Sequence, residues 1–159
     1  MKVSLNWLST WVPINLDVPS LCDLLTMAGL EVDGHEPAAA SLENVVVGRV
    51  EACEQHPDAD KLSVCQVSDG TGENFTVVCG APNVAKDQTV AYARPGAVLP
   101  NGMKLKVAKL RGVESHGMLC SAAELGLGDA ADGIITLPDA APIGATLVDY
   151  LSLDDHIID

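Results

Sequence analysis

The pattern of hydrophobic and polar residues changes its period along the chain. In the first 38 residues the apolar positions recur at the spacing of an α-helix. Two helices are predicted there, one from Ser4 to Pro13 and one from Asp17 to Gly29. Gly29 suits a helix end because glycine adopts the left-handed conformation without strain. Residues 31–36 are predicted as a strand that leads out of this part.

From Asn44 the period changes to two, which is the side-chain period of a strand with one buried face. Turn-forming residues separate five predicted strands. These strands span residues 44–52, 62–68, 75–79, 89–94 and 104–110, and a late short strand is predicted at 132–137. Closely spaced strands joined by tight turns are typical of a small closed or nearly closed barrel.

The fifth predicted strand contains a shift in its alternation. Lys104 and Lys106 alternate with apolar residues in the first half, whereas Lys109 and Arg111 do so in the second half, one residue out of phase. A β-bulge between residues 107 and 108 would bring all four basic side chains to one face. Without it two of them would point into the core, where an unpaired ammonium group costs several kcal/mol. We therefore expect a bulge and a stripe of four positive charges.

The chain also shows signs of domain boundaries and further short elements. Residues 37–41 form the best candidate linker, so we expect a domain boundary there. Ser121 and Glu124 have the spacing of a capping box, which predicts a helix of one or two turns. Thr146 is placed to cap a last short helix. The apolar pair at 157–158 resembles an element cut in its middle, so we expect a fragment of a longer protein.

Charge is distributed unevenly along the sequence. The 159 residues carry 9 Lys and Arg and 22 Asp and Glu, a net charge of −13, which taken as a whole disfavours nucleic acid. Residues 81–111 nevertheless hold six basic residues and one acidic residue, a local net charge of +5. From charge alone, this segment suits a solvated surface as well as it suits a phosphate-binding surface.

Composition excludes several classes of protein. An apolar content of 48% excludes disorder, and an aromatic content of 3% leaves Val, Leu, Ile and Ala to build the core. No apolar run approaches the ~18 residues that a membrane span needs, and the N-terminus shows no signal peptide. Five scattered cysteines without a C-x-x-C pair favour reduced thiols and a cytoplasmic protein.

Catalytic motifs are mostly missing. The sequence has no glycine-rich phosphate loop, nucleophile elbow or zinc-protease motif. His56, Asp58 and Asp60 resemble a metal cluster, but Asp and Pro at this spacing are more typical of a turn. Cys120 beside His116 suggests a nucleophile and a base, although a small buried residue is the simpler interpretation.

A five-stranded barrel, a basic stripe and polar turns together indicate an oligonucleotide-binding (OB) fold. Aromatic residues for stacking on bases are almost missing. Trp7 and Trp11, four residues apart on a helix, are better suited to a packing surface than to a stacking platform. We therefore expect weak contact with the shape and phosphates of a structured RNA.

Several longer strings resemble the tRNA-binding domain found in aminoacyl-tRNA synthetases and their accessory proteins. In order and spacing they match across residues 44–151. The strings are His56–Leu62, Val78–Val84, Gly96–Pro100 and Leu110–Ser121.

The two ends of the chain narrow the resemblance to the N-terminal region of the bacterial phenylalanyl-tRNA synthetase beta subunit. The similarity covers essentially the whole chain. The strings at the ends are Asn6–Leu8, Leu25–Val32, Glu124–Asp129, Asp132–Ile135 and Tyr150–Asp155.

This resemblance implies a mainly β chain with flanking helices. An OB-fold tRNA-binding domain would occupy residues 40–151 and be inserted in a small α/β domain, of which residues 1–39 are one part. That second domain would continue at residues 152–159 and beyond. The family's enzyme pairs two alpha with two beta subunits in the cytoplasm, and the alpha subunit joins phenylalanine to its tRNA with ATP and magnesium. The editing site of the beta subunit lies downstream, so no catalytic residue, cofactor or metal is expected within this chain.

We expect RNA contact through the basic segment and two polar residues of the matched strings. The candidates are Lys86, Arg94, Lys104, Lys106, Lys109, Arg111, Asn83 and Ser115. The net charge departs from the freestanding modules of the family, which are basic. Two alternatives therefore stay open: an autonomous tRNA-binding accessory protein, and a structural scaffold that makes no contact with RNA.

Overall fold

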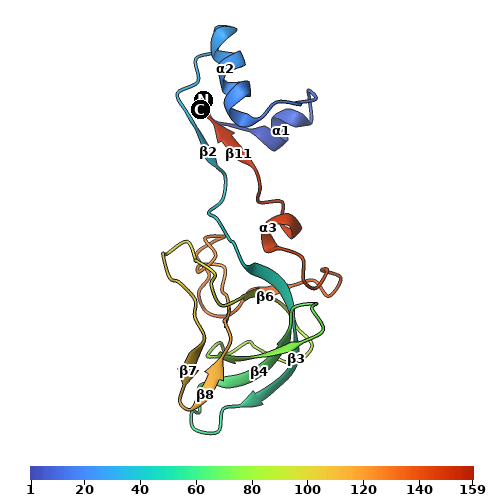
Figure 1. The fold of residues 1–159 in the computed structure, drawn as a ribbon, viewed down its shortest axis with the longest axis vertical. Helices are drawn as coiled ribbons and strands as arrows, with labels where there is room; N and C mark the ends of the chain where they lie inside the picture. Colours follow the sequence, from blue (N-terminus) through green and yellow to red (C-terminus); the bar gives the residue numbers. More distant parts are fainter. The chain divides into compact units, whose positions relative to one another are not determined.

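The computed structural model describes residues 1–159, which form two compact units (Figure 1). Residues 1–39 and 152–159 make up the first, which we call the split unit. Residues 40–151 make up the second, which we call the barrel unit. Both ends of the chain therefore belong to one unit, and the barrel unit is formed by the chain between them. No helix in the chain is long and apolar enough to cross a bilayer.

The split unit combines two helices with a three-stranded antiparallel sheet. Its elements are β1 (Val3–Ser4), α1 (Leu5–Ser9), α2 (Val18–Met27), β2 (His35–Pro37) and β11 (His156–Ile158). The sheet order is β1-β11-β2, so the last strand of the chain lies between two strands from its beginning (Figure 1).

Side-chain caps explain where the helices of the split unit begin. The Ser4 hydroxyl accepts a hydrogen bond from Trp7 N at 3.1 Å, and an Asp17 carboxylate oxygen accepts one from Ser20 N at 2.8 Å. Each cap satisfies a backbone N–H that has no partner within the helix. The two predicted helices are confirmed. The strand predicted at residues 31–36 is shorter and later, because pairing with β11 begins only at His35.

The barrel unit is mainly β. Its elements are β3 (Val45–Gln55), β4 (Ser63–Ser68), β5 (Asn74–Cys79), β6 (Thr89–Ala93), β7 (Ala108–Leu110), β8 (Val113–Ser115), β9 (Met118–Leu119), β10 (Thr136–Leu137) and α3 (Leu147–Tyr150). The main sheet has the order β10-β6-β3-β4-β5, with β9 also paired to β6, and all its pairs are antiparallel. Thr146 caps α3, as predicted.

The sheet curves until its edge strand β5 meets the chain between β8 and β9. His116 N donates to Thr76 O at 2.8 Å, and Val78 N donates to the Ser115 hydroxyl at 3.0 Å. At Gly117 a Cβ atom would lie 2.2 Å from Ala93 O, so only glycine allows β9 to approach β6 this closely. The predicted fold class, a mainly β chain with a nearly closed five-stranded barrel, is confirmed.

Valine is the commonest residue in the interior of the barrel. Val50, Val67, Val77 and Val90 are fully buried, as the low aromatic content led us to expect. Tyr92 is the large exception: its ring stacks near Phe75, and its hydroxyl donates to a backbone carbonyl. Burial raises the pKa of Tyr92 to about 12, so this hydroxyl stays protonated and keeps its bond.

The predicted strand 104–110 is wrong. Residues 104–107 form no strand, although Lys104 makes an isolated bridge with Val98, and only Ala108–Leu110 forms a strand, β7. The alternation of Lys104, Leu105 and Lys106 arises instead because Leu105 is buried beneath a tight loop. There its N–H donates to Ala97 O at 2.8 Å. A bulge does occur in the barrel, but it lies in β3 between Val50 and Ala52.

Two shorter predictions need similar correction. The capping-box hydrogen bonds of Ser121 and Glu124 form, but a turn rather than a helix follows them. Nearby, Leu125 N bonds to Ser121 O while Leu127 N bonds back to Ala122 O, so the helical pattern does not propagate. In the segment predicted as a strand at 132–137, only Thr136–Leu137 pairs with β6.

Candidate nucleic-acid interface

A tight loop after β6 presents the first pair of basic side chains. Gly96 N donates to Leu105 O at 2.7 Å, and Leu99 N donates to Met103 O at 2.9 Å. These bonds bury Leu99 and Leu105 against the barrel. Lys104 and Lys106 flank Leu105 and are both exposed. The burial of one leucine therefore exposes a lysine on each side of it.

The β7–β8 hairpin presents the second pair. Leu110 pairs with Val113, and the two residues between them, Arg111 and Gly112, have φ angles of 49° and 89°. Two consecutive positive φ angles define a type I′ turn, whose twist matches that of the strands it joins. Lys109 and Arg111 are exposed on this hairpin.

The basic side chains thus come from loops and from the β7–β8 hairpin, and not from one strand. Five of the six basic side chains within residues 81–111 are exposed, and none of these five has a carboxylate oxygen within 4.0 Å; Lys61, also exposed and unpaired, lies outside this segment. We call these the free cations: Lys86, Lys104, Lys106, Lys109 and Arg111. Unpaired exposed cations are the groups that neutralise nucleic-acid phosphates and release counterions.

Arg94 differs from the free cations because it is held in an ion pair. Its Nε and one terminal nitrogen donate to the same Asp69 carboxylate oxygen at 2.9 and 2.7 Å. The Asp69 side chain is 3% exposed. Burial alone would raise the pKa of Asp69, but hydrogen bonds from Thr71 and Arg94 outweigh it and hold that pKa below its ordinary value. This pair joins the start of a turn to the end of β6.

Asn83 and Ser115, the two polar candidates, use their side chains within the barrel. Asn83 Nδ2 donates to Ile134 O at 2.9 Å, and Asn83 Oδ1 accepts from Ile134 N at 3.0 Å. The Ser115 hydroxyl, 3% exposed, accepts from Val78 N and donates to Gly117 O. The Asn83 bonds join two loops, and the Ser115 bonds join β8 to β5 and to Gly117. Because both side chains are used in this way, the free cations are the better-placed candidates for RNA contact.

His56 is a residue whose role the sequence did not reveal. Its ring is 2% exposed, Nδ1 accepts a hydrogen bond from Asp58 N at 3.0 Å, and Nε2 lies 3.0 Å from Leu110 O. With Nδ1 occupied as an acceptor, Nε2 carries the proton and donates to the carbonyl. His56 therefore ties its own turn to the β7–β8 hairpin. No group of three or more His, Cys, Asp or Glu side chains in the chain is arranged to hold a metal ion.

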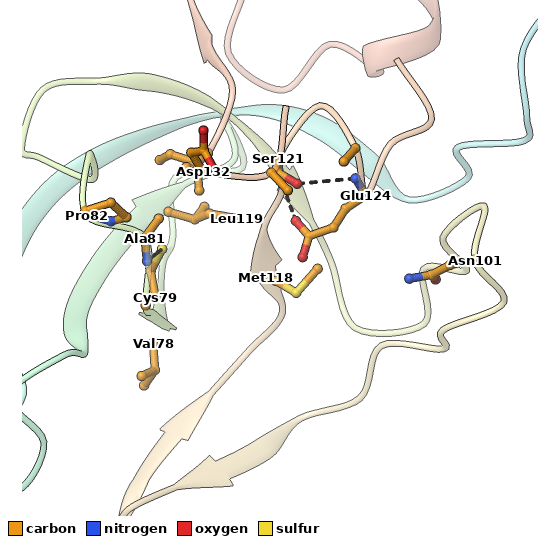
Figure 2. A pocket seen from close by; sticks show the side chains of 15 residues that line it. Val78, Cys79, Ala81, Pro82, Asn101, Met118, Leu119, Ser121, Glu124 and Asp132 are labelled. Atoms are coloured by element: carbon orange, nitrogen blue, oxygen red, sulfur yellow. Dashed lines mark hydrogen bonds between the residues drawn. The ribbon is translucent and has the colours of Figure 1, made fainter. Parts of the chain in front are cut away.

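A cleft of about 570 Å³ opens between the end of β5 and the chain around β9 (Figure 2). Ser121 N donates to Glu124 Oε2 at 2.7 Å, and Glu124 N donates to Ser121 Oγ at 3.2 Å, as the dashed lines in Figure 2 show. Asp132 adds a second carboxylate to the lining. Two carboxylates repel phosphate, so the cleft is poorly suited to the RNA backbone.

Cys120 lies beside this cleft and is fully buried. Burial raises the pKa of the Cys120 thiol to about 12, so the reactive thiolate is scarce near neutral pH. The interpretation of Cys120 as a small buried residue, rather than as a nucleophile, agrees with this. All five cysteines are free thiols.

Comparison with known proteins agrees with this geometry. Residues 45–146 match the family described as "Putative tRNA binding domain". The chain belongs to this family. The matched residues include the barrel strands and all five free cations.

The whole chain is also similar to phenylalanine–tRNA ligase beta subunits. It is 53% identical to that of Pseudoalteromonas translucida and 55% identical to that of Pseudomonas fluorescens. Both matches cover 100% of this chain and 20% of the relative, so the chain spans one fifth of the length of these relatives. The resemblance to this subunit, stated from the sequence, is confirmed.

Among solved structures, the tRNA-binding domain resembles a MetRS related protein from Pyrococcus horikoshii. The identity is 28% and the TM-score is 0.46, over 64% of this chain and 85% of the other.

Proposed function

We propose that this chain is the tRNA-binding and assembly module of a phenylalanine–tRNA ligase beta subunit. The observation that carries the proposal is the set of five free cations, all within residues 86–111, on a barrel of the tRNA-binding family. Phosphates of an RNA are the natural partners of such a set. Screening limits the opposing field of the surrounding carboxylates to ~8–10 Å near physiological salt, so exposed cations can still act on phosphates that come close to them.

In the complete ligase this module supports the attachment of phenylalanine to its specific tRNA. Catalysis, with ATP and magnesium, takes place on the alpha subunit, in a cytoplasmic assembly of two alpha and two beta chains. The chain alone is therefore expected to make no phenylalanyl-tRNA. Its full-length similarity to the beta subunits supports this proposal.

The split unit is the part that we propose for assembly. Trp7 is 58% exposed, Trp11 is 73% exposed and Met27 is 88% exposed. Large apolar side chains left in water are typical of a surface that another polypeptide covers. We propose that residues 1–39 and 152–159 form part of a larger domain, completed by other residues of the beta subunit.

A scaffold without RNA contact is the second candidate, and the net charge of −13 favours it. The two candidates differ in one measurable property. A phosphate-binding module shows an affinity for RNA that falls steeply with salt, because each neutralised phosphate contributes about −0.7 to −0.9 to the slope of log K against log salt. A scaffold shows no such affinity at any salt concentration.

The test is a titration of the 159-residue chain with a phenylalanine-specific tRNA transcript at two salt concentrations. We expect weak binding at low ionic strength that disappears as salt rises. The absence of any binding at low ionic strength would reject the tRNA-binding proposal and favour the scaffold. An autonomous accessory protein would instead bind equally well with or without the alpha subunit and the rest of the beta subunit, whereas the proposed module binds more tightly within the complete ligase.

A further inference from the structure

The turn at the tip of the β7–β8 hairpin contains an unusual residue. In a type I′ turn both central residues have positive φ, so Asn, Asp or Gly is strongly preferred at the first central position. Arg111 occupies that position here with a φ of 49°. Its side chain is too long to bond to the adjacent backbone in the way that makes Asn and Asp tolerant of this conformation. Arginine is thus a poor choice for the turn itself.

No contact of the Arg111 side chain with the rest of the protein explains this choice. Arg111 is exposed, and its guanidinium has neither an ion pair nor a hydrogen bond to the protein. Arg94 shows the opposite situation, since its guanidinium makes two short bonds to Asp69. Backbone conformations of this kind persist when the surrounding structure imposes them, and they cluster where ligands bind.

The hairpin tip is also held firmly in place. The carbonyl that His56 binds belongs to Leu110, the residue immediately before Arg111. The His56 ring is buried, and its other nitrogen is bound by Asp58 N. The buried ring therefore fixes the point from which the Arg111 side chain leaves the barrel unit.

We propose that Arg111 is the residue that anchors the RNA phosphate backbone, and that His56 is its positioning residue. The guanidinium presents a planar fork of N–H donors that matches two phosphate oxygens, whereas a lysine offers only a point charge. Within the hairpin, Lys109 lies opposite Glu114 in the strand register, while no carboxylate lies opposite Arg111. This inference rests on the proposed tRNA binding and specifies how it is achieved.

Three substitutions separate the geometry of Arg111 from its charge. Arg111→Asn suits the turn but removes the guanidinium, and Arg111→Lys keeps the charge and the turn strain but removes the fork. Lys2→Asn is the matched control, because it removes one exposed cation from the split unit, outside the interface. The measurements are the affinity of the 159-residue chain for a phenylalanine-specific tRNA transcript at two salt concentrations, and the thermal stability of each variant.

We expect Arg111→Asn to raise the melting temperature and to weaken tRNA binding by about tenfold or more, because hydrogen bonds to charged groups are among the stronger ones. Its salt slope should fall by about 0.7–0.9, the contribution of one phosphate. Arg111→Lys should bind several-fold more weakly than the wild type with an unchanged slope. Lys2→Asn should bind like the wild type.

The role of His56 is tested by a double-mutant cycle. His56→Leu removes the donor to Leu110 O, whereas the side-chain amide of Gln in His56→Gln can still donate. If His56 acts through Arg111, His56→Leu weakens binding in the wild-type background but causes little further loss in Arg111→Asn. His56→Gln should retain most of the affinity. It also provides the folded comparison if His56→Leu fails to fold.

The outcomes distinguish this inference from the proposed function. If the wild type shows no salt-dependent binding, both the proposed tRNA binding and the anchoring role of Arg111 are rejected. If the wild type binds and Arg111→Asn binds equally well, or if that variant is less stable than the wild type, the anchoring role of Arg111 is rejected while tRNA binding stands. If the losses of His56→Leu and Arg111→Asn simply add, or His56→Gln loses as much affinity as Arg111→Asn, His56 does not position Arg111.

Discussion

The two units of this protein differ sharply in how much of their apolar surface they bury. In the split unit only Leu21 and Ile158 are buried apolar side chains, and all the other buried apolar side chains belong to the barrel unit. Burial of apolar area contributes roughly 25 cal/mol per Å², and it must offset the entropy lost on ordering the chain. The barrel unit meets this requirement with its own residues. The split unit depends much more on whatever covers its exposed tryptophans and leucines.

Hydrogen exchange should show the largest difference between the units. We expect amides of residues 20–28, in α2 and its C-cap, to exchange faster by orders of magnitude than those of residues 46–52, in β3, because weakly packed elements open locally at a small cost in free energy. Exchange of the 159-residue chain, followed by NMR or mass spectrometry, measures this directly. Equal protection of the two segments would mean that the split unit is as stable as the barrel, or that two copies of the chain cover each other.

Shortening one leucine in each unit should give the next largest contrast. Leu119 is 4% exposed within the core cluster, so Leu119→Ala should destabilise the barrel by about 2–5 kcal/mol. Leu24 is 54% exposed, so Leu24→Ala should change stability by about 0.5 kcal/mol or less. Chemical denaturation of the two variants measures both values. A large loss for Leu24→Ala would reveal a partner for α2 in the isolated chain.

The ion pairs of the two units should also differ in how much they contribute to stability, although these contributions are smaller. Asp69→Asn removes the buried partner of Arg94, and we expect a loss of about 1–3 kcal/mol, below the value for a fully buried pair because Arg94 is 34% exposed. The pair between Lys2 and Glu36 in the split unit is 63% exposed on both sides, so Lys2→Met should leave the melting temperature unchanged.

The pH dependence of the Asp69 pair follows from the direction of its pKa shift. The folded pKa of Asp69 is lowered from 3.8, so the unfolded chain binds more protons in the acid range. The stabilisation is fully present above the ordinary carboxyl pKa, and it is lost as the pH falls through the folded value. Asp69→Asn should therefore flatten the acid limb of the stability curve, and an unchanged acid limb would contradict this account of the pair.

Substitutions of the free cations should have the smallest effects on stability. Here the two units should differ in tRNA binding instead. Changing Lys106 and Lys109 together to Ala should leave the fold intact, because both side chains are exposed. It should weaken tRNA binding and flatten the salt slope by up to about 2. Lys2→Ala in the split unit serves as the control. If the double variant binds tRNA like the wild type, these lysines are only solvated.

Features that depend on neighbours in sequence were predictable. The caps at Ser4, Asp17 and Thr146 each join groups three residues apart, and all three form. The barrel strands up to Ala93 were predictable from alternation and from the turns between them, although both faces of β6 and of the start of β3 are buried. The basic character of the candidate interface was likewise visible in composition alone.

The errors arose where distant residues decide the local structure. The alternation around Leu105 was read as a strand, but it reflects the burial of that leucine under a loop closed by Ala97. The bond between His56 and Leu110 spans 54 residues, and nothing in the His-Pro-Asp string indicates its partner. The sequence predicts Arg94 as an RNA contact like the free cations, because a charge count does not show that Asp69 lies beside it.

The position of β11 has a consequence for the order in which the protein takes shape during synthesis. Val3 pairs with Ile158 and His35 also pairs with Ile158, so the sheet of the split unit lacks its central strand until the end of this chain has emerged from the ribosome. The barrel strands, which end with β10 at Leu137, are synthesised before β11, and domains generally fold as units during synthesis. The nascent chain therefore carries a finished barrel while the split unit still lacks its central strand, and this interval is when chaperones have most reason to bind it.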